Sequence, residues 1–289
     1  MRDDLPSLTA EAVCLMRAAD EARPADVRII HDPYAKHFLR PATRALLAGL
    51  DATRGAGDLT NMFSPGLFSY IRSRHRFIDD ALLAAVEGGT VRQLVIMGAG
   101  YDSRAWRLAQ TLSGIPVFEV DFPSTGERKA RLLEQKVQSR PDADVRRVAI
   151  DFQIQRLDER LLAEGFEPGL PTFFIWEGVS MYLTRQAVKA TLSTVCELGG
   201  PGSRVSMDLF MLADTPDIAG TWHRVSGGFL HLLGEPVTFA LHPEDAVPFL
   251  AREGWTVVDL ADANELTSRY VKDGRRVHAT GYVLTAEKT

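Results

Sequence analysis

Four short apolar runs of the sequence each end in residues that could contact a ligand, a glycine pair in one case and an acidic residue in three. In chain order these endings are Gly98-Ala99-Gly100, Asp121, Asp151 and Glu177. Glycines let the backbone turn tightly and let a ligand approach closely. A carboxylate about 20 positions after such glycines suits a bidentate hydrogen bond to ribose hydroxyls. The order of these residue types therefore predicts a site for a cofactor that contains a nucleoside.

Each ending also has a purely structural interpretation. Gly98 and Gly100 could form only a tight strand-to-helix turn, and Asp121 could cap a helix that begins near Pro123. The third glycine of the dinucleotide fingerprint is absent, because Ser103 stands in its place, and this weakens a nicotinamide interpretation. Ligands of open α/β sheets bind beyond the carboxyl ends of the strands, so four such endings in succession are hard to explain by packing.

Residues beside these endings add to the predicted site. Asp151 could accept a hydrogen bond from an exocyclic amine, and the ring of Phe152 could pack on a purine. Glu119 alternates to the same face as Asp121 and is a weaker candidate for the ribose.

Three arginines, Arg72, Arg74 and Arg76, fall within a helix expected over residues 68–86. A solvated basic face is the ordinary interpretation of such a run. Arg72 and Arg76 lie four residues apart, whereas Arg74 lies on another side of the helix, so one of the three can turn inward. An inward guanidinium suits a ligand carboxylate, which it binds through a bidentate charge-assisted pair.

The hydrophobic pattern predicts the elements that position these residues. After residue 90, short apolar runs alternate with helical spacing, which predicts βαβ units and a mostly parallel sheet. The expected strands are 92–97, 117–121, 146–151, 172–176 and 204–209, and the expected helices between them are 102–112, 123–138 and 185–197. Two late strands, 255–260 and 277–285, separated by a short polar segment, are expected to form an antiparallel edge pair.

Helices are expected before the sheet, over residues 9–17, 33–39, 42–50 and 68–86, with a loop over 53–65. The stretch 210–239 breaks the alternation of strands and helices and is interpreted as a helical cap. The predicted organisation is an N-terminal helical region or lid, 1–90, followed by a domain over 91–289 with the cap inserted at about 210–240. The fold class is α/β, a Rossmann-like sheet with helices on both faces.

Composition narrows the function classes. The 289 residues are 45% hydrophobic and 25% charged, as in ordinary globular proteins. A net charge of -5 gives no support for a general nucleic-acid surface. No apolar run reaches the length of a membrane span, and the first residues lack the apolar core of a signal peptide, so a cytoplasmic location is expected. Cys14 and Cys196 are interpreted as buried thiols, and no metal site is predicted.

The sequence resembles the leucine carboxyl methyltransferase-like family of class I S-adenosylmethionine-dependent methyltransferases, which includes bacterial members that act on polyketides and other small molecules. The resemblance runs from about Arg28 to the C-terminus. It is carried by the segments Asp32-Pro33-Tyr34-Ala35, 98–108, 119–123 and Trp176-Glu177-Gly178-Val179-Ser180-Met181-Tyr182-Leu183.

The resemblance implies S-adenosylmethionine as the cofactor and gives each candidate a role. Arg74 would bind the methionine carboxylate, Glu177 would approach the methionine amino group, and Asp121 would hold the ribose hydroxyls. The other implied contacts are the methionine and ribose portion for Gly98, Ala99 and Gly100, and the adenine for Asp151 and Phe152.

The acceptor is expected to be a small organic, for example polyketide-like, molecule that is methylated on oxygen, with a carboxylate favoured over a hydroxyl. An ionised carboxylate needs no general base, whereas a hydroxyl would benefit from one. His223, His231 and Tyr182 are the candidates for such a catalytic group, although histidines are more often structural. Two alternatives stay open on the residues alone: a nicotinamide-dependent oxidoreductase and a non-catalytic small-molecule binder on the same fold.

Overall fold

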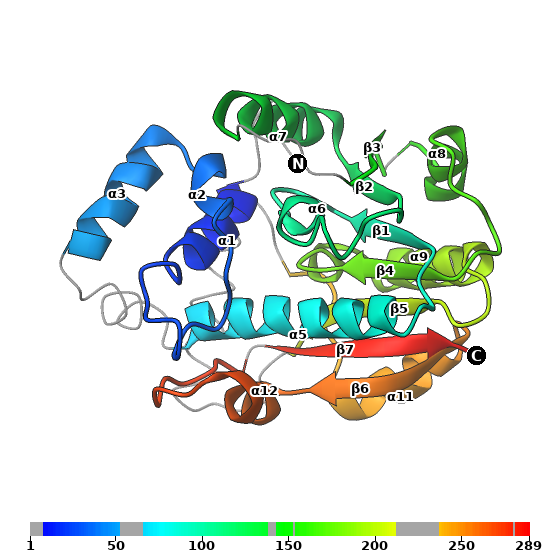
Figure 1. Cartoon of the computed structure of the whole chain (residues 1–289). Coiled ribbons are helices and arrows are strands. Elements are labelled where there is room, and N and C mark those ends of the chain that lie inside the picture. Colours follow the sequence, from blue (N-terminus) through cyan, green and yellow to red (C-terminus); the bar gives the residue numbers. More distant parts are fainter. Residues whose placement is uncertain (1–7, 53–65, 138–142, 153, 212–236, 280) are drawn as a thin grey trace.

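The computed structural model describes residues 8–52, 66–137, 143–152, 154–211, 237–279 and 281–289. Its centre is a seven-stranded sheet with the order β3-β2-β1-β4-β5-β7-β6 (Figure 1). The strands are β1 (Gln93–Met97), β2 (Val117–Asp121), β3 (Val145–Ala149), β4 (Thr172–Trp176), β5 (Arg204–Phe210), β6 (Trp255–Ala261) and β7 (Gly281–Lys288). Strands β1 to β5 pair in parallel, and β7 pairs antiparallel to both β5 and β6. The predicted Rossmann-like α/β fold with an antiparallel edge is confirmed.

The central strands are buried on both faces. All five residues of β1 are buried; Leu94 and Ile96 pack into the core on one face of the sheet, and Val95 and Met97 pack into the core on the other. Parallel strands with helices on both sides lose the alternation of apolar and polar residues. This double burial is the reason why the strand appears in the sequence as a continuous apolar run.

Helices cover both faces of this sheet. On one face lie α5 (Leu67–Glu87), α6 (Arg104–Arg107), α7 (Pro123–Lys136) and α12 (Ala263–Tyr270). On the other lie α8 (Leu157–Ala163), α9 (Arg185–Leu198) and α11 (Pro243–Ala251). Helices α1 (Leu8–Ala18), α2 (Ala35–Phe38) and α3 (Pro41–Ala52) gather on the side toward which β1 and β4 run (Figure 1). None of the helices that the structure describes has both the length and the apolar character that crossing a membrane demands.

Strands β3 and β7 differ most from the sequence prediction. Strand β3 ends at Ala149, so Asp151 and Phe152 follow the strand instead of ending it. Strand β7 begins at Gly281 rather than at Val277. After β3 the apolar run continues beyond the ladder, because Ile150 is fully buried although it lies outside the strand.

The polar segment between the two late strands contains a helix, α12, that the sequence prediction missed. The side chain of Asp262 accepts hydrogen bonds from the backbone N–H groups of Asn264 and Glu265, both at 2.9 Å. An N-cap Asp with Glu at the third helical position is a helix-start pattern, so the signal was present in the sequence. Helices α8 and α11 were also not predicted.

The helix expected over residues 102–112 is shorter in the structure, where α6 spans only Arg104–Arg107 and turns follow it. Most of the predicted cap falls on residues 212–236, and the predicted loop on 53–65; both lie outside the described residues. Strand β5 continues to Phe210, shortly before residues 212–236, and the described residues after them, 237–242, contain no helix.

Candidate functional site

The glycine turn after β1 lies at the topological switch point of the sheet, because β2 and β4 flank β1 on opposite sides. Gly98 has φ +68° and Gly100 has φ +45°, in the left-handed region. A Cβ built on Gly98 would clash with the side chain of Val179, which follows β4. Glycine at position 98 is therefore required both by the turn and by the close approach of the neighbouring loop.

Asp121, at the end of β2, faces this turn. Its carboxylate accepts hydrogen bonds from the backbone N–H groups of Gly100 and Phe122, the latter at 2.6 Å. Burial raises the pKa of this carboxyl group. Glu119 on the same strand is instead engaged in a buried ion pair, with its Oε1 2.8 Å from Nζ of Lys129. Of the two acidic residues on β2, the structure thus brings Asp121 to the glycine turn and gives Glu119 a structural partner.

Of the three arginines on α5, Arg74 is the one that reaches the ends of the strands. Its Nε donates to Oε1 of Glu177, after β4, at 3.0 Å, and its Nη1 donates to Oδ2 of Asp208, on β5, at 2.7 Å. Asp208 also accepts the N–H of Gly178 at 2.6 Å. Arg76 is exposed. A buried guanidinium between two carboxylates is thereby fixed at the carboxyl edge of the sheet.

Arg72 is buried as well, which the helical spacing did not predict, but it points elsewhere. Its Nε donates to the carbonyl of Met16 at 2.6 Å, and its Nη1 lies 3.2 Å from Oδ1 of Asp20. The same Asp20 oxygen lies 3.4 Å from Arg23 and 3.6 Å from Arg275. We call Asp20, Arg23, Arg72 and Arg275 the Asp20 hub; it joins the segment after α1 to α5 and to the segment before β7.

Glu177 belongs to a larger group of buried and partly buried charges, which we call the charged cluster. Its members are Arg74, His75, Asp79, Asp102, Arg104, Arg107, Glu177 and Asp208. Arg104 is fully buried at its centre and donates to Asp79 Oδ1 at 2.7 Å, to Glu177 Oε2 at 2.9 Å and to Asp102. Burial alone would raise the pKa of Glu177, but His75, Arg104 and Arg74 hold it well below its usual range. Glu177 is therefore a carboxylate at neutral pH.

Three members of the cluster, His75, Asp102 and Glu177, offer ligand atoms within 4.8 Å of one another, as metal ligands do. The guanidinium of Arg104 donates to both carboxylates, and its Nη2 lies 2.9 Å from Nδ1 of His75. A metal ion bound by these three residues would lie beside the positive charge of Arg104, which would repel it. We therefore interpret this trio as part of an ion-pair network.

The N-terminal helices rest on the glycine turn. Arg17 of α1 donates to the carbonyl of Tyr101 at 2.7 Å, and the ring of Phe38 stacks on that of Tyr101 with centroids 5.3 Å apart. Arg17 is held in turn by Asp32, at 3.2 Å. The Asp-Pro-Tyr-Ala segment noted in the sequence thus orients the arginine that contacts the turn.

The predicted adenine residues lie beyond the end of β3. The backbone N–H of Asp151 donates to Oε1 of Gln155 at 2.9 Å, and Phe152 is half-exposed. They are adjacent to the end of β2, because the N–H of Ile150 donates to the carbonyl of Asp121 at 2.9 Å.

Of the three predicted catalytic candidates, the structure describes Tyr182 alone. Tyr182 is partly buried in a short 3-10 turn, Ser180–Tyr182, after β4. His223 and His231 lie outside the described residues.

The sequence prediction missed Asp208, Asp79 and Arg104 as parts of this site. The sequence contains a sign of the role of Asp208, since an acidic residue in the middle of an otherwise apolar strand needs a buried partner. Asp79 had a weaker one, its position four residues after His75 on the same helix.

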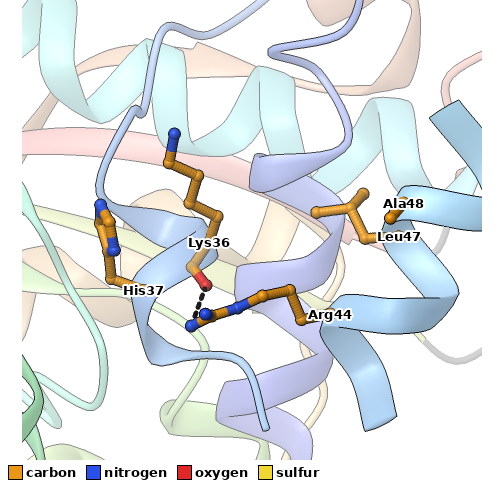
Figure 2. A pocket seen from close by; sticks show the side chains of 5 residues that line it. All are labelled: Lys36, His37, Arg44, Leu47 and Ala48. Carbon is orange, nitrogen blue, oxygen red and sulfur yellow. Dashed lines mark hydrogen bonds between the residues drawn. The ribbon is translucent and has the colours of Figure 1, made fainter. Parts of the chain in front are cut away.

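A second group of basic residues surrounds a hollow between α2 and α3 (Figure 2). Lys36, His37, Arg44, Leu47 and Ala48 line it. Arg44 donates to the carbonyl of Lys36 at 3.4 Å, and Lys136 of α7 donates to that of His37 at 2.8 Å. Cations at the C-terminal carbonyls of a helix are stabilising, so capping of α2 accounts for this hollow's charge.

Comparisons with known proteins agree with this geometry. The family model for leucine carboxyl methyltransferase matches residues 10–196. A Saccharopolyspora erythraea protein provisionally named S-adenosyl-L-methionine-dependent methyltransferase is 33% identical over 97% of this chain and 95% of its own. A Mycobacteroides abscessus protein of the same name is 34% identical over 91% and 83%. The crystal structure of a duf574 family protein from Streptomyces avermitilis aligns with a TM-score of 0.61 over 95% of this chain and 97% of that one, at 14% identity, which shows the shared fold.

Proposed function

The chain belongs to the leucine carboxyl methyltransferase family and is an S-adenosylmethionine-dependent methyltransferase, and from this premise we propose that it methylates a carboxylate oxygen of a small organic molecule. Family membership removes the nicotinamide-dependent oxidoreductase from consideration. The absence of the third fingerprint glycine, with Ser103 in its place, agrees with this.

The adjacent, opposite charges of Arg74 and Glu177 are the observation that supports the cofactor site in this proposal. Their side chains lie 3.0 Å apart at the carboxyl edge of the sheet. An amino-acid zwitterion needs one cation for its carboxylate and one anion for its ammonium, so this pair fits the methionine end of the cofactor. Asp121, beside the glycine turn, supplies a carboxylate for the ribose hydroxyls.

The remaining candidates complete the proposed cofactor site. Gly98, Ala99 and Gly100 would lie against the methionine and ribose portion, and Asp151 and Phe152 would bracket the adenine. S-adenosylmethionine, when bound, supplies a methyl group on an already activated sulfonium. The chain's own contribution is then to align the acceptor and to exclude water.

A carboxylate acceptor agrees with the contacts of His75, a histidine at the carboxyl edge of the sheet. His75 is fully buried, and its ring nitrogens lie 2.9 Å from Glu177 Oε2 and 3.1 Å from Arg107 Nη2. A ring engaged in this way has no free nitrogen with which to take a proton from a substrate hydroxyl. An ionised carboxylate requires no such base.

The proposal is tested by methyl transfer from labelled S-adenosylmethionine to a panel of aromatic and aliphatic carboxylic acids and matched phenols, with product masses. Esters should form from the acids, and S-adenosylhomocysteine, but not NADH, should raise the melting temperature. Methylation of phenols alone would disprove the carboxylate preference. Binding without transfer to any acceptor would point to a non-catalytic binder.

Replacing Arg74 with lysine should weaken S-adenosylhomocysteine binding by about tenfold or more, because a single ammonium cannot reproduce a planar fork of donors. Isothermal titration calorimetry measures the effect. Arg76→Lys is the matched control, since Arg76 is exposed, pairs with Asp80 at 2.7 Å at the surface and donates to the carbonyl of Ile29 at 3.5 Å. If Arg76→Lys proved the more damaging change, the assignment of Arg74 would be wrong.

Replacing His223 or His231 with alanine, or Tyr182 with phenylalanine, should leave the maximal rate within about tenfold, since a general base typically contributes about a hundredfold or more. Single-turnover methyl transfer at saturating substrate measures the chemical step for each variant. A loss of about a thousandfold with intact binding would indicate base-assisted methylation of a hydroxyl instead.

A further inference from the structure

We propose that His75 is a neutral imidazole, protonated on Nδ1, that positions the carboxylate of Glu177 for the cofactor. The inference rests on the proposed function in one respect, the contact between Glu177 and the cofactor's amino group. His75 itself is one residue beyond Arg74 on α5 and is fully buried.

The surroundings of Nε2 exclude a proton on that nitrogen. Nη2 of Arg107 lies 3.1 Å from Nε2, and a guanidinium nitrogen can only donate. The same Nη2 donates to Oδ1 of Asp79 at 3.0 Å, which uses one of its two hydrogens and leaves the other for His75. Nε2 must therefore present its lone pair.

The surroundings of Nδ1 require a proton there. Both carboxylate oxygens of Glu177 face it, at 2.9 and 3.2 Å, and a carboxylate can only accept. Nη2 of Arg104 is also 2.9 Å from Nδ1, but its two hydrogens have acceptors in Glu177 Oε2, at 2.9 Å, and the His75 carbonyl, at 3.2 Å. Only the tautomer with the proton on Nδ1 satisfies every neighbour.

The charges around the ring also favour the neutral form. Two guanidiniums, Arg104 and Arg107, face it together with the carboxylates of Glu177 and Asp79. Burial, followed by the field of Arg104, lowers the pKa of His75. A second proton, on Nε2, would face the N–H donor of Arg107, so an imidazolium would have no acceptor at Nε2.

The neutral ring gives Glu177 a third donor beside those of Arg74 and Arg104, and this donor faces both carboxylate oxygens. Arg74 donates to Oε1 and Arg104 donates to Oε2, so each arginine holds one oxygen. The Nδ1–H group lies 2.9 and 3.2 Å from the two oxygens and restrains the carboxylate as a whole. His75 is thus a positioning residue for Glu177, because it acts through that carboxylate.

Two conservative variants separate this role from simple packing. Asparagine can place its amide N–H where Nδ1 lies and keep the bond to Glu177, whereas glutamine can place its amide oxygen where Nε2 lies and keep only the contact with Arg107. We expect His75→Asn to bind S-adenosylhomocysteine within about threefold of the wild type, and His75→Gln to bind about tenfold more weakly, with a raised KM for the cofactor and a smaller change in kcat. Arg76→Ala serves as the control at an exposed position. Equal losses in the Asn and Gln variants, or the reverse order, would overturn the positioning role.

Nitrogen-15 NMR of the histidine-labelled wild type provides a second readout that does not depend on the cofactor. The signal that disappears in His75→Asn should show a proton on Nδ1 and none on Nε2, from about pH 6 to about pH 8. A proton on Nε2, or on both nitrogens, overturns the inference. Failure of the wild type to bind S-adenosylhomocysteine is instead the failure of the proposed function, so the two outcomes are distinguishable.

Discussion

Replacing Arg104 with methionine should lower the free energy of unfolding by about 3–5 kcal/mol, because removing one partner of a buried ion pair leaves its counter-charges without compensation. Arg104 is fully buried and donates to the carboxylates of Asp79, Asp102 and Glu177. Methionine fills much of the volume of the arginine stem, so the change removes charge more than packing. Urea unfolding followed by circular dichroism measures the loss.

Arg76→Met is the matched control for this prediction. Arg76 lies on the exposed side of α5 and pairs with Asp80, and exposed ion pairs contribute at most about 1 kcal/mol. A loss of less than about 1 kcal/mol in Arg104→Met would mean that the charged cluster is hydrated in solution and that its carboxylates do not depend on this guanidinium.

Replacing Asp121 with alanine should weaken the binding of S-adenosylhomocysteine by about a hundredfold, or roughly 3 kcal/mol, through the loss of two charge-assisted hydrogen bonds to the ribose. The carboxylate also accepts a hydrogen bond from the N–H of Gly100, so the substitution removes this bond to the glycine turn as well. Calorimetry on the folded variant measures the affinity, and unchanged affinity would contradict the ribose assignment.

Two further variants separate these contributions of Asp121. Asp121→Asn retains an oxygen that can accept from Gly100 but loses the negative charge, so it should hold the turn and still bind the cofactor more weakly than the wild type. Asp158→Ala removes an acidic residue that pairs with Arg156 at the surface, 2.6 Å away, and should leave the affinity unchanged.

The sheet could be predicted from the sequence because its central strands are short and mostly apolar runs. Strands β2 and β4 match the predicted bounds, and β1 and β5 match to within one residue. Helix α12 was missed because its apolar content is low, and only the cap at Asp262 marks its start. Short amphipathic helices of this kind obtain their stability from packing, which periodicity alone does not reveal.

The candidate site could be predicted only where its residues sit at the ends of strands. Asp121 and Glu177 follow apolar runs, so topology alone brings them to one edge of the sheet. The pair between Arg74 and Asp208 joins residues 134 positions apart, and no local pattern encodes such a contact. Most contacts of the charged cluster also join distant residues, because its members come from two helices and three loops or strands.

The Asp20 hub has a consequence for the synthesis of the chain. Nη2 of Arg275 donates to the carbonyl of Val27, 248 residues earlier, and Arg23 donates to Asp273 across 250 residues. A ribosome adds about 5–20 residues per second, so the segment after α1 waits on the order of ten to fifty seconds for these partners. During that interval the segment after α1 can contact Arg72 of α5 but lacks its contacts with Asp273 and Arg275. The last connections between the segment after α1 and the rest of the fold therefore form only when synthesis of the chain is nearly complete.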